Sequence, residues 1–129
     1  MPDLETTRGM LAAARRDLLA ISNMLDTERF PDEIFGFLAQ QAIEKSLKAW
    51  LAFCDQEVPK THNLRLLLVL LARTGENLTR EWELIDLTAF AVQFRYESFT
   101  VDHTPLARTP ILNQITALFQ RVEDICRHA

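Results

Sequence analysis

The chain has 129 residues, of which 48% are hydrophobic and 25% are charged. This length and composition fit one globular domain over residues 1–129 and exclude a disordered chain, because leucine, isoleucine and phenylalanine are plentiful enough to form a core. The formal net charge of -4 excludes an extended DNA-binding surface, since phosphate backbones require clustered lysine and arginine.

The first two expected helices cover residues 4–26 and 32–54. In the first, apolar residues recur at helical spacing along one stripe, and Asp3 is a suitable N-cap. Pro31 separates the two helices, and Asp32 and Glu33 suit the positive first turn of the second. Because apolar residues cover most of the circumference of the second helix, we expect it to lie at the centre of a bundle.

Three further helices are expected along the rest of the chain. Thr61 is the expected cap of the third, residues 62–74, which Gly75 terminates. Thr79 is the expected cap of the fourth, which ends with Arg95 and Tyr96. The fifth covers residues 108–128, with Thr109 as its expected cap. No strand is expected apart from a few residues of SFTV, residues 98–101, so the predicted fold is an all-α antiparallel up-and-down helical bundle.

Neither the start of the chain nor its cysteines indicate secretion. No signal-peptide pattern is present, and the longest strongly apolar run, residues 66–72, is too short to cross a bilayer. Cys54 and Cys126 match no metal or redox spacing and lie on apolar helix faces, which favours small buried core residues. We therefore expect a cytoplasmic protein without a membrane segment.

Four polar residues form one face of the second helix: Gln41, Glu44, Lys45 and Lys48. The spacing alone favours a solvated face with Glu44 and Lys48 paired; the alternative is a cleft in which the lysines meet an anion. His62 lies at the start of the third helix, where a histidine is usually a local hydrogen-bonding residue. The alternative is a contact with phosphate beside Lys60 and free backbone amides.

The segment FRYESFTVDHTP, residues 94–105, combines an arginine, a tyrosine, carboxylates and a histidine. Metal-free RNA cleavage needs a base for the 2′-hydroxyl and a cation for the charge on phosphorus, and His103 and Arg95 could serve in these roles. The residues alone favour a simpler interpretation, in which Arg95 pairs with a carboxylate and His103 is exposed. No metal-ligand spacing, glycine-rich phosphate loop or nucleophile elbow is present, so no metal or cofactor is expected.

Three segments in this order resemble the stand-alone HEPN domain of bacteria and archaea, named for presumed nucleotide binding in higher eukaryotes and prokaryotes. They are FLAQQAIEKSLKAWLAF, THNLRLLL and FRYES. The resemblance covers residues 5–127 and is most specific over residues 40–49. It implies a helical bundle that commonly forms homodimers and is often encoded beside a minimal nucleotidyltransferase, with which it pairs as toxin and antitoxin.

Several branches of that family are metal-independent ribonucleases with an arginine and a histidine close together. Here seven residues separate Arg95 from His103, a longer spacing than that motif has. The chain is more similar to the branch with an Arg-Tyr ending on the fourth helix, which implies nucleotide or partner binding. We therefore expect a nucleotide-binding or interaction module whose ligand contacts are Arg95, Tyr96, Lys45, Lys48 and His62. The alternative is a metal-independent endoribonuclease toxin that uses Arg95 and His103.

Overall fold

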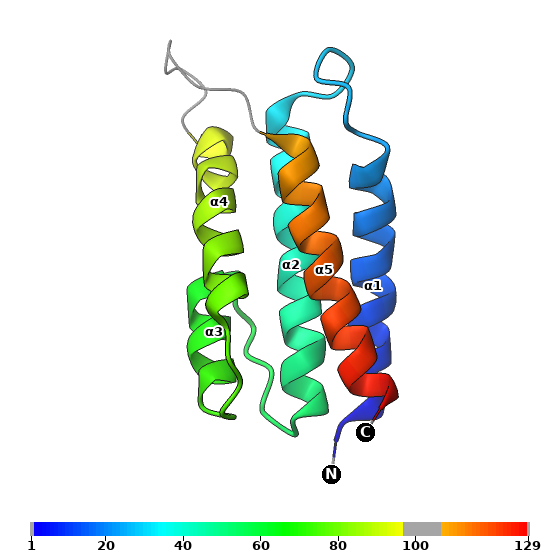
Figure 1. The fold of residues 1–129 in the computed structure, drawn as a ribbon, viewed down its shortest axis with the longest axis vertical. Helices are drawn as coiled ribbons and strands as arrows, with labels where there is room; N and C mark the ends of the chain where they lie inside the picture. The colour runs from blue at the N-terminus through cyan, green and yellow to red at the C-terminus, as the bar shows by residue number, and fades with distance from the viewer. Residues whose placement is uncertain (1, 97–106, 129) are drawn as a thin grey trace.

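The computed structural model describes residues 2–96 and 107–128, with the backbone alone for residues 89–96. These residues form five helices and no strand: α1 (Leu4–Ser22), α2 (Asp32–Phe53), α3 (Leu64–Ala72), α4 (Thr79–Tyr96) and α5 (Arg108–Arg127). In Figure 1, α1 and α4 run against α2 and α5, and the short α3 lies beside α4. The predicted all-α antiparallel bundle is confirmed. Residues 98–101, considered for a strand, lie outside the described residues.

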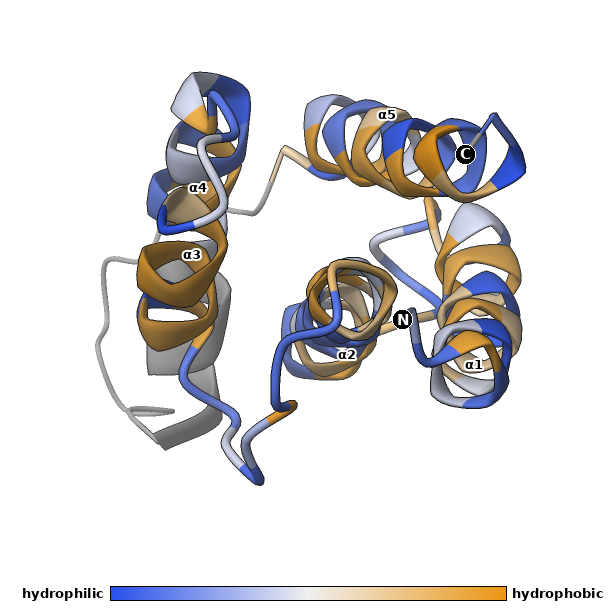
Figure 2. Ribbon diagram, turned by 90° about the horizontal axis from the view of Figure 1, so that it is seen from below, coloured by the Kyte–Doolittle hydropathy of each residue, from blue (hydrophilic) through white to orange (hydrophobic). Residues whose placement is uncertain are grey.

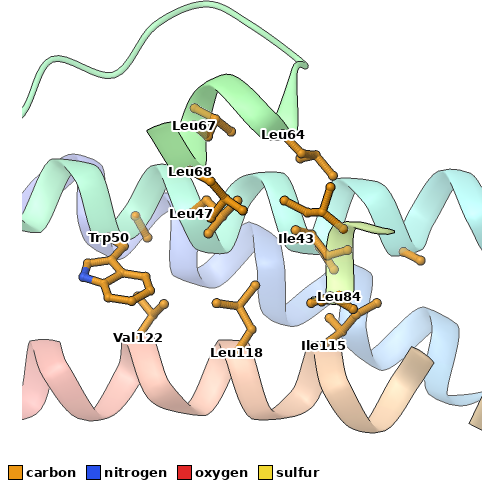
Figure 3. Close-up of a cluster of buried hydrophobic side chains, with 14 of the residues drawn as sticks. Ile43, Leu47, Trp50, Leu64, Leu67, Leu68, Leu84, Ile115, Leu118 and Val122 are labelled. Atoms are coloured by element: carbon orange, nitrogen blue, oxygen red, sulfur yellow. The ribbon is translucent and has the colours of Figure 1, made fainter. Parts of the chain in front are cut away.

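The second helix is central, as predicted. Helix α2 packs against each of the other four helices, and Figure 2, which looks along the bundle, shows it between α1, α5 and the α3–α4 pair. Figure 3 shows how its apolar side chains meet those of α3 on one side and α5 on the other. The core residues in contact there include Ile43, Leu47, Trp50, Leu67, Leu68, Ile115, Leu118 and Val122. In the described part of the chain, no helix combines the length and apolarity that a membrane crossing requires.

Asp3 caps α1, as predicted. Its carboxylate accepts hydrogen bonds from the Thr6 amide at 3.0 Å and the Thr6 hydroxyl at 2.7 Å. The predicted extension of this helix to residue 26 is wrong, because α1 ends at Ser22. Asp26 instead forms a turn, in which its side chain accepts a 2.9 Å hydrogen bond from the Glu28 amide.

The predicted cap of α3 is wrong by two residues. The side-chain oxygen of Asn63, rather than that of Thr61, accepts hydrogen bonds from the amides of Arg65 and Leu66, at 3.0 Å and 3.2 Å. The Thr61 hydroxyl accepts from the Asn63 amide at 3.1 Å and so orders the approach to the helix. Both residue types are good N-caps, and the position of the turn decides between them.

The predicted cap of α5 is also wrong. Thr109 lies inside the helix, which begins at Arg108, and the N-cap residue Ala107 makes no side-chain cap bond. The Arg108 side chain is 3% exposed and donates to the backbone oxygen of Phe30 and, at 2.8 Å, to the Asp32 carboxylate. It therefore ties the start of α5 to the α1–α2 connection and to the start of α2.

The two cysteines are free and half-buried at the edge of the core, rather than fully buried. Burial raises the pKa of the Cys54 thiol, and the negative charge of Glu76 raises it further. Burial likewise raises the pKa of Cys126. Because the thiolate is the reactive form, both thiols are less reactive at neutral pH than an exposed cysteine.

Candidate functional site

A buried carboxylate stands at the middle of α2. The Glu44 side chain is 4% exposed, and each of its oxygens has a partner. Oε2 lies 3.3 Å from Nζ of Lys48, one helical turn further along, and Oε1 lies 2.8 Å from Nδ1 of His62. A buried carboxylate is costly unless it is paired, so Lys48 and His62 stabilise the charge of Glu44. We refer to these three residues as the Glu44 cluster.

His62 is held through its ring and its backbone. Its Nδ1 faces Glu44, and its backbone oxygen accepts a 3.4 Å hydrogen bond from the Gln40 side-chain amide. A carboxylate only accepts hydrogen bonds, so we assign the donor hydrogen to Nδ1, which leaves Nε2 for another partner. The His62 side chain is 81% exposed. It is therefore an oriented imidazole, open to solvent, of a kind that can bind an anion or transfer a proton.

The interpretation of the polar face on α2 as solvated is wrong for Glu44 and Lys48, which are 3% and 8% exposed. Lys45, by contrast, lies against α1, where its Nζ donates to the Asp17 carboxylate at 2.7 Å. Three residues of the stripe thus have different neighbours: Lys45 faces α1, whereas Glu44 and Lys48 pair with each other and lie beside His62. The i, i+4 spacing of Glu44 and Lys48 on a largely apolar helix was the available sign of a buried pair, but the spacing could not show what covers it.

A shallow pocket of about 480 Å³ lies between the start of α1 and the α2–α3 connection. Lys48 lines it from α2, while Val58, Pro59 and Lys60 line it from the connection. Lys48 also contacts Glu44, and Lys60 is two residues from His62 in the chain. The pocket and the Glu44 cluster are therefore neighbours.

Arg95 and Tyr96 end α4, as predicted, and the structure describes their backbone. The carboxyl end of α4 lies at the end of the bundle where α2 and α5 begin (Figure 1). Glu44 lies 12 residues after Asp32 in α2, which is about 18 Å along the helix axis at a rise of about 1.5 Å per residue. His103 lies outside the described residues.

The five expected ligand contacts therefore lie in three places within the chain. Lys48 and His62 gather around Glu44, Lys45 lies against α1, and the last turn of α4 lies towards the end of the bundle. Whether these residues bind a ligand stays a prediction.

A second groove, of about 640 Å³, lies between the start of α4 and α5. Its Arg121 donates to the Asn77 backbone oxygen at 3.0 Å and to the Glu81 carboxylate at 2.7 Å. The same guanidinium lies 4.6 Å from the centre of the Trp50 ring. These contacts join α4 to α5 and to the core, which is a structural role. Among the described residues, no three His, Cys, Asp or Glu side chains are grouped so that they could hold a metal ion.

Comparison with protein families matches residues 7–125 of the 129-residue chain to the HEPN domain. This match covers most of α1 and α5 and everything between them. Comparisons with curated proteins and with solved structures give no significant match. The family supports a nucleotide-binding or ribonuclease-type module. On the extent of the match, the chain belongs to the HEPN domain family.

Proposed function

We propose that this protein binds the phosphate groups of a nucleotide or of RNA and works with a minimal nucleotidyltransferase in a toxin–antitoxin-like pair. Family membership supports the class of ligand. The Glu44 cluster carries the proposal of binding, because a buried carboxylate there orients an exposed imidazole. The nucleotidyltransferase partner rests on the resemblance described above.

Arg95 and Tyr96 form the first group of proposed contacts. The negative carboxyl end of α4 favours a cation, and an arginine there can hold phosphate through two N–H groups. Tyr96 adds a ring on which a base can stack. Lys48 and His62 form the second group. Lys45 takes part where a ligand displaces the Asp17 carboxylate from its ammonium group.

Binding is tested with AMP and with a labelled single-stranded oligoribonucleotide. We expect Arg95→Ala to weaken binding by about tenfold to a hundredfold, because a charge-assisted hydrogen bond contributes about 1.5–3 kcal/mol. Arg16→Ala, which removes an exposed arginine of α1, is the matched control and should bind as the wild type does. A wild-type protein that binds neither probe contradicts the proposed function.

The partner is tested by searching for a minimal nucleotidyltransferase reading frame next to that of this chain and by co-expressing the two proteins. We expect the two proteins to purify together and to give one complex by light scattering. Separate elution of the two proteins at micromolar concentration contradicts this part of the proposal.

The second candidate is a metal-independent endoribonuclease, in which Arg95 stabilises charge on phosphorus and His103 is the base. The position of Arg95 in the last turn of α4 supports it. It predicts RNA cleavage in the presence of EDTA that both Arg95→Ala and His103→Ala abolish. RNA that binds to the protein but is not cleaved supports the binding module instead.

A further inference from the structure

Three residues that can carry positive charge lie along the approach to α3 and in its first turn: Lys60, His62 and Arg65, which we call the α3 patch. The segment PKTHNLR, residues 59–65, contains these three and no acid, in a chain whose net charge is -4. All three side chains are exposed. Figure 2 shows this hydrophilic approach leading into the apolar α3. A local positive patch on an acidic protein is a feature that an anionic ligand can recognise.

The guanidinium of Arg65 is available for a ligand. Its Nη2 lies 3.4 Å from the Asp86 carboxylate, and the two side chains are 59% and 68% exposed. An ion pair this exposed contributes little and can be replaced by a stronger anion. Asp86 and the exposed Glu57 nevertheless lower the local positive charge, so the patch suits a short stretch of phosphates rather than a long duplex.

At this patch a ligand would be bound by side chains and not by the backbone amides at the start of α3. The Asn63 side chain already accepts hydrogen bonds from the amides of Arg65 and Leu66, so these are not free for a ligand. His62 differs from an ordinary surface histidine, because its Nδ1 is bound to the buried Glu44 and its Nε2 remains open. The charge of Glu44 is itself balanced by Lys48 at 3.3 Å.

We propose that the α3 patch is a phosphate-recognition site of this protein, and that Glu44 is the residue that positions His62 within it. The ligand is a phosphate group carried by a nucleotide or by single-stranded RNA. It is held by Lys60, by Arg65 and by the Nε2–H that His62 presents when both of its ring nitrogens carry hydrogen. The inference rests on the proposed function, and it adds a phosphate contact at the start of α3 to the one proposed at the last turn of α4.

The first experiment measures binding of AMP, of adenosine and of a labelled single-stranded oligoribonucleotide to charge-neutralised variants. We expect Lys60→Gln, His62→Gln and Arg65→Gln each to weaken binding of the phosphate-bearing probes by about three- to tenfold. Adenosine lacks phosphate, so the wild type should bind adenosine no more tightly than these variants bind AMP. Arg73→Gln, at the opposite end of α3 and also exposed, is the matched control and should bind as the wild type does.

The two probes identify the source of the phosphate. RNA is the ligand if the oligoribonucleotide binds more tightly than AMP. In that case the slope of the logarithm of the binding constant against the logarithm of the salt concentration should fall by about 0.7 when Lys60 or Arg65 is removed. Equal or tighter binding of AMP identifies a nucleotide. Both results support the patch; an Arg73→Gln effect as large as that of Arg65→Gln overturns it.

The second experiment tests the positioning role of Glu44. Glu44→Leu combined with Lys48→Met removes the buried pair together, since deleting one partner alone would leave a buried charge. In this background we expect His62→Gln to have no further effect on binding, while Lys60→Gln still weakens it. An undiminished effect of His62→Gln contradicts the positioning role.

A spectroscopic measurement keeps the test valid should the double variant unfold. Long-range ¹H–¹⁵N spectra of the wild type should show the His62 tautomer with its hydrogen on Nδ1, and a dominant Nε2 tautomer contradicts the positioning role. Wild-type binding that Arg95→Ala abolishes and the α3 variants leave intact overturns this inference alone. A wild type that binds neither probe overturns the proposed function as well.

Discussion

At the scale of single residues, two buried charges hold the parts of this bundle together. Glu44 connects α2 to the connection that precedes α3, and Arg108 connects the start of α5 to the α1–α2 connection. Arg108 spreads its donors over several acceptors, including the Met24 backbone oxygen at 2.6 Å and the Asp32 carboxylate at 2.8 Å. The planar guanidinium suits this geometry better than an ammonium group would.

We expect Arg108→Ala to lower the free energy of unfolding by about 3 kcal/mol, because it leaves buried acceptors without their donor. Arg108→Lys should recover part of this loss, since it restores the charge but not the fork of donors. Urea unfolding followed by circular dichroism measures both, with the exposed Arg16→Ala as control. A loss below about 0.5 kcal/mol, the range of ordinary surface substitutions, contradicts the structural role of Arg108.

The cysteine thiols predict a pH dependence of stability. Their pKa values in the folded protein are raised above the ordinary value near 9.0, chiefly by burial. The folded state therefore keeps thiol protons that the unfolded state loses, so stability is full below pH 9.0 and falls as the pH rises above it. Urea unfolding at pH 7.5 and at pH 9.5 tests this. The free energy of unfolding should fall less between these pH values for the double variant Cys54→Ala, Cys126→Ala than for the wild type. Equal falls would contradict this assignment.

At the scale of elements, the short α3 depends on its amino end. It has nine residues, too few for a stable helix in isolation, so capping and packing on α2 stabilise it. Asn63 accepts from two of its first amides, and Thr61 orders the residue before it. The same turn presents His62 to Glu44, so the cap and the candidate site share one local structure.

Asn63→Ala should lower the free energy of unfolding by about 1 kcal/mol, the usual contribution of an N-cap side chain. Thr61→Ala should cost less, because it loses one hydrogen bond outside the helix. Thermal unfolding compares the two variants under the same conditions. A larger effect of Thr61→Ala would restore the cap predicted from the sequence.

At the scale of the whole molecule, the apolar surface of α2 is used inside one chain, since α1, α3, α4 and α5 all pack on it. This surface therefore gives no support to the homodimer, which we propose on the resemblance described above. Some large apolar side chains remain exposed. Ile34 lies at the start of α2, and the others lie outside that helix: Leu4, Leu19, Leu25, Leu66 and Val69.

We expect light scattering at micromolar concentration to give twice the chain mass of 14.9 kDa. A homodimer would bring two copies of the last turn of α4 and of the α3 patch into one particle. A mass of a single chain at that concentration contradicts the dimer, whereas it leaves the binding tests on the single chain unaffected.

The sequence by itself determined the helices, their order and the central place of α2. Periodic apolar residues report which face of a helix must leave water, and that information is local. The segments around Glu44, His62 and Arg95 were also sufficient to indicate the family that the comparison then confirmed. Caps were less predictable: Asp3 was right, whereas Thr61 and Thr109 were wrong, because several residues near a helix start can serve.

Only the tertiary structure decided which polar residues meet. Lys45 and Lys48 are three positions apart, yet one lies against Asp17 of α1 and the other beside Glu44. His62 reaches Glu44 from 18 positions away, and Arg108 reaches Asp32 from 76 positions away. Such contacts depend on how helices pack and connections turn, which the spacing of residues along one helix does not contain. Local patterns in the sequence were therefore sufficient to predict the fold, whereas the packing of the helices determined the candidate site.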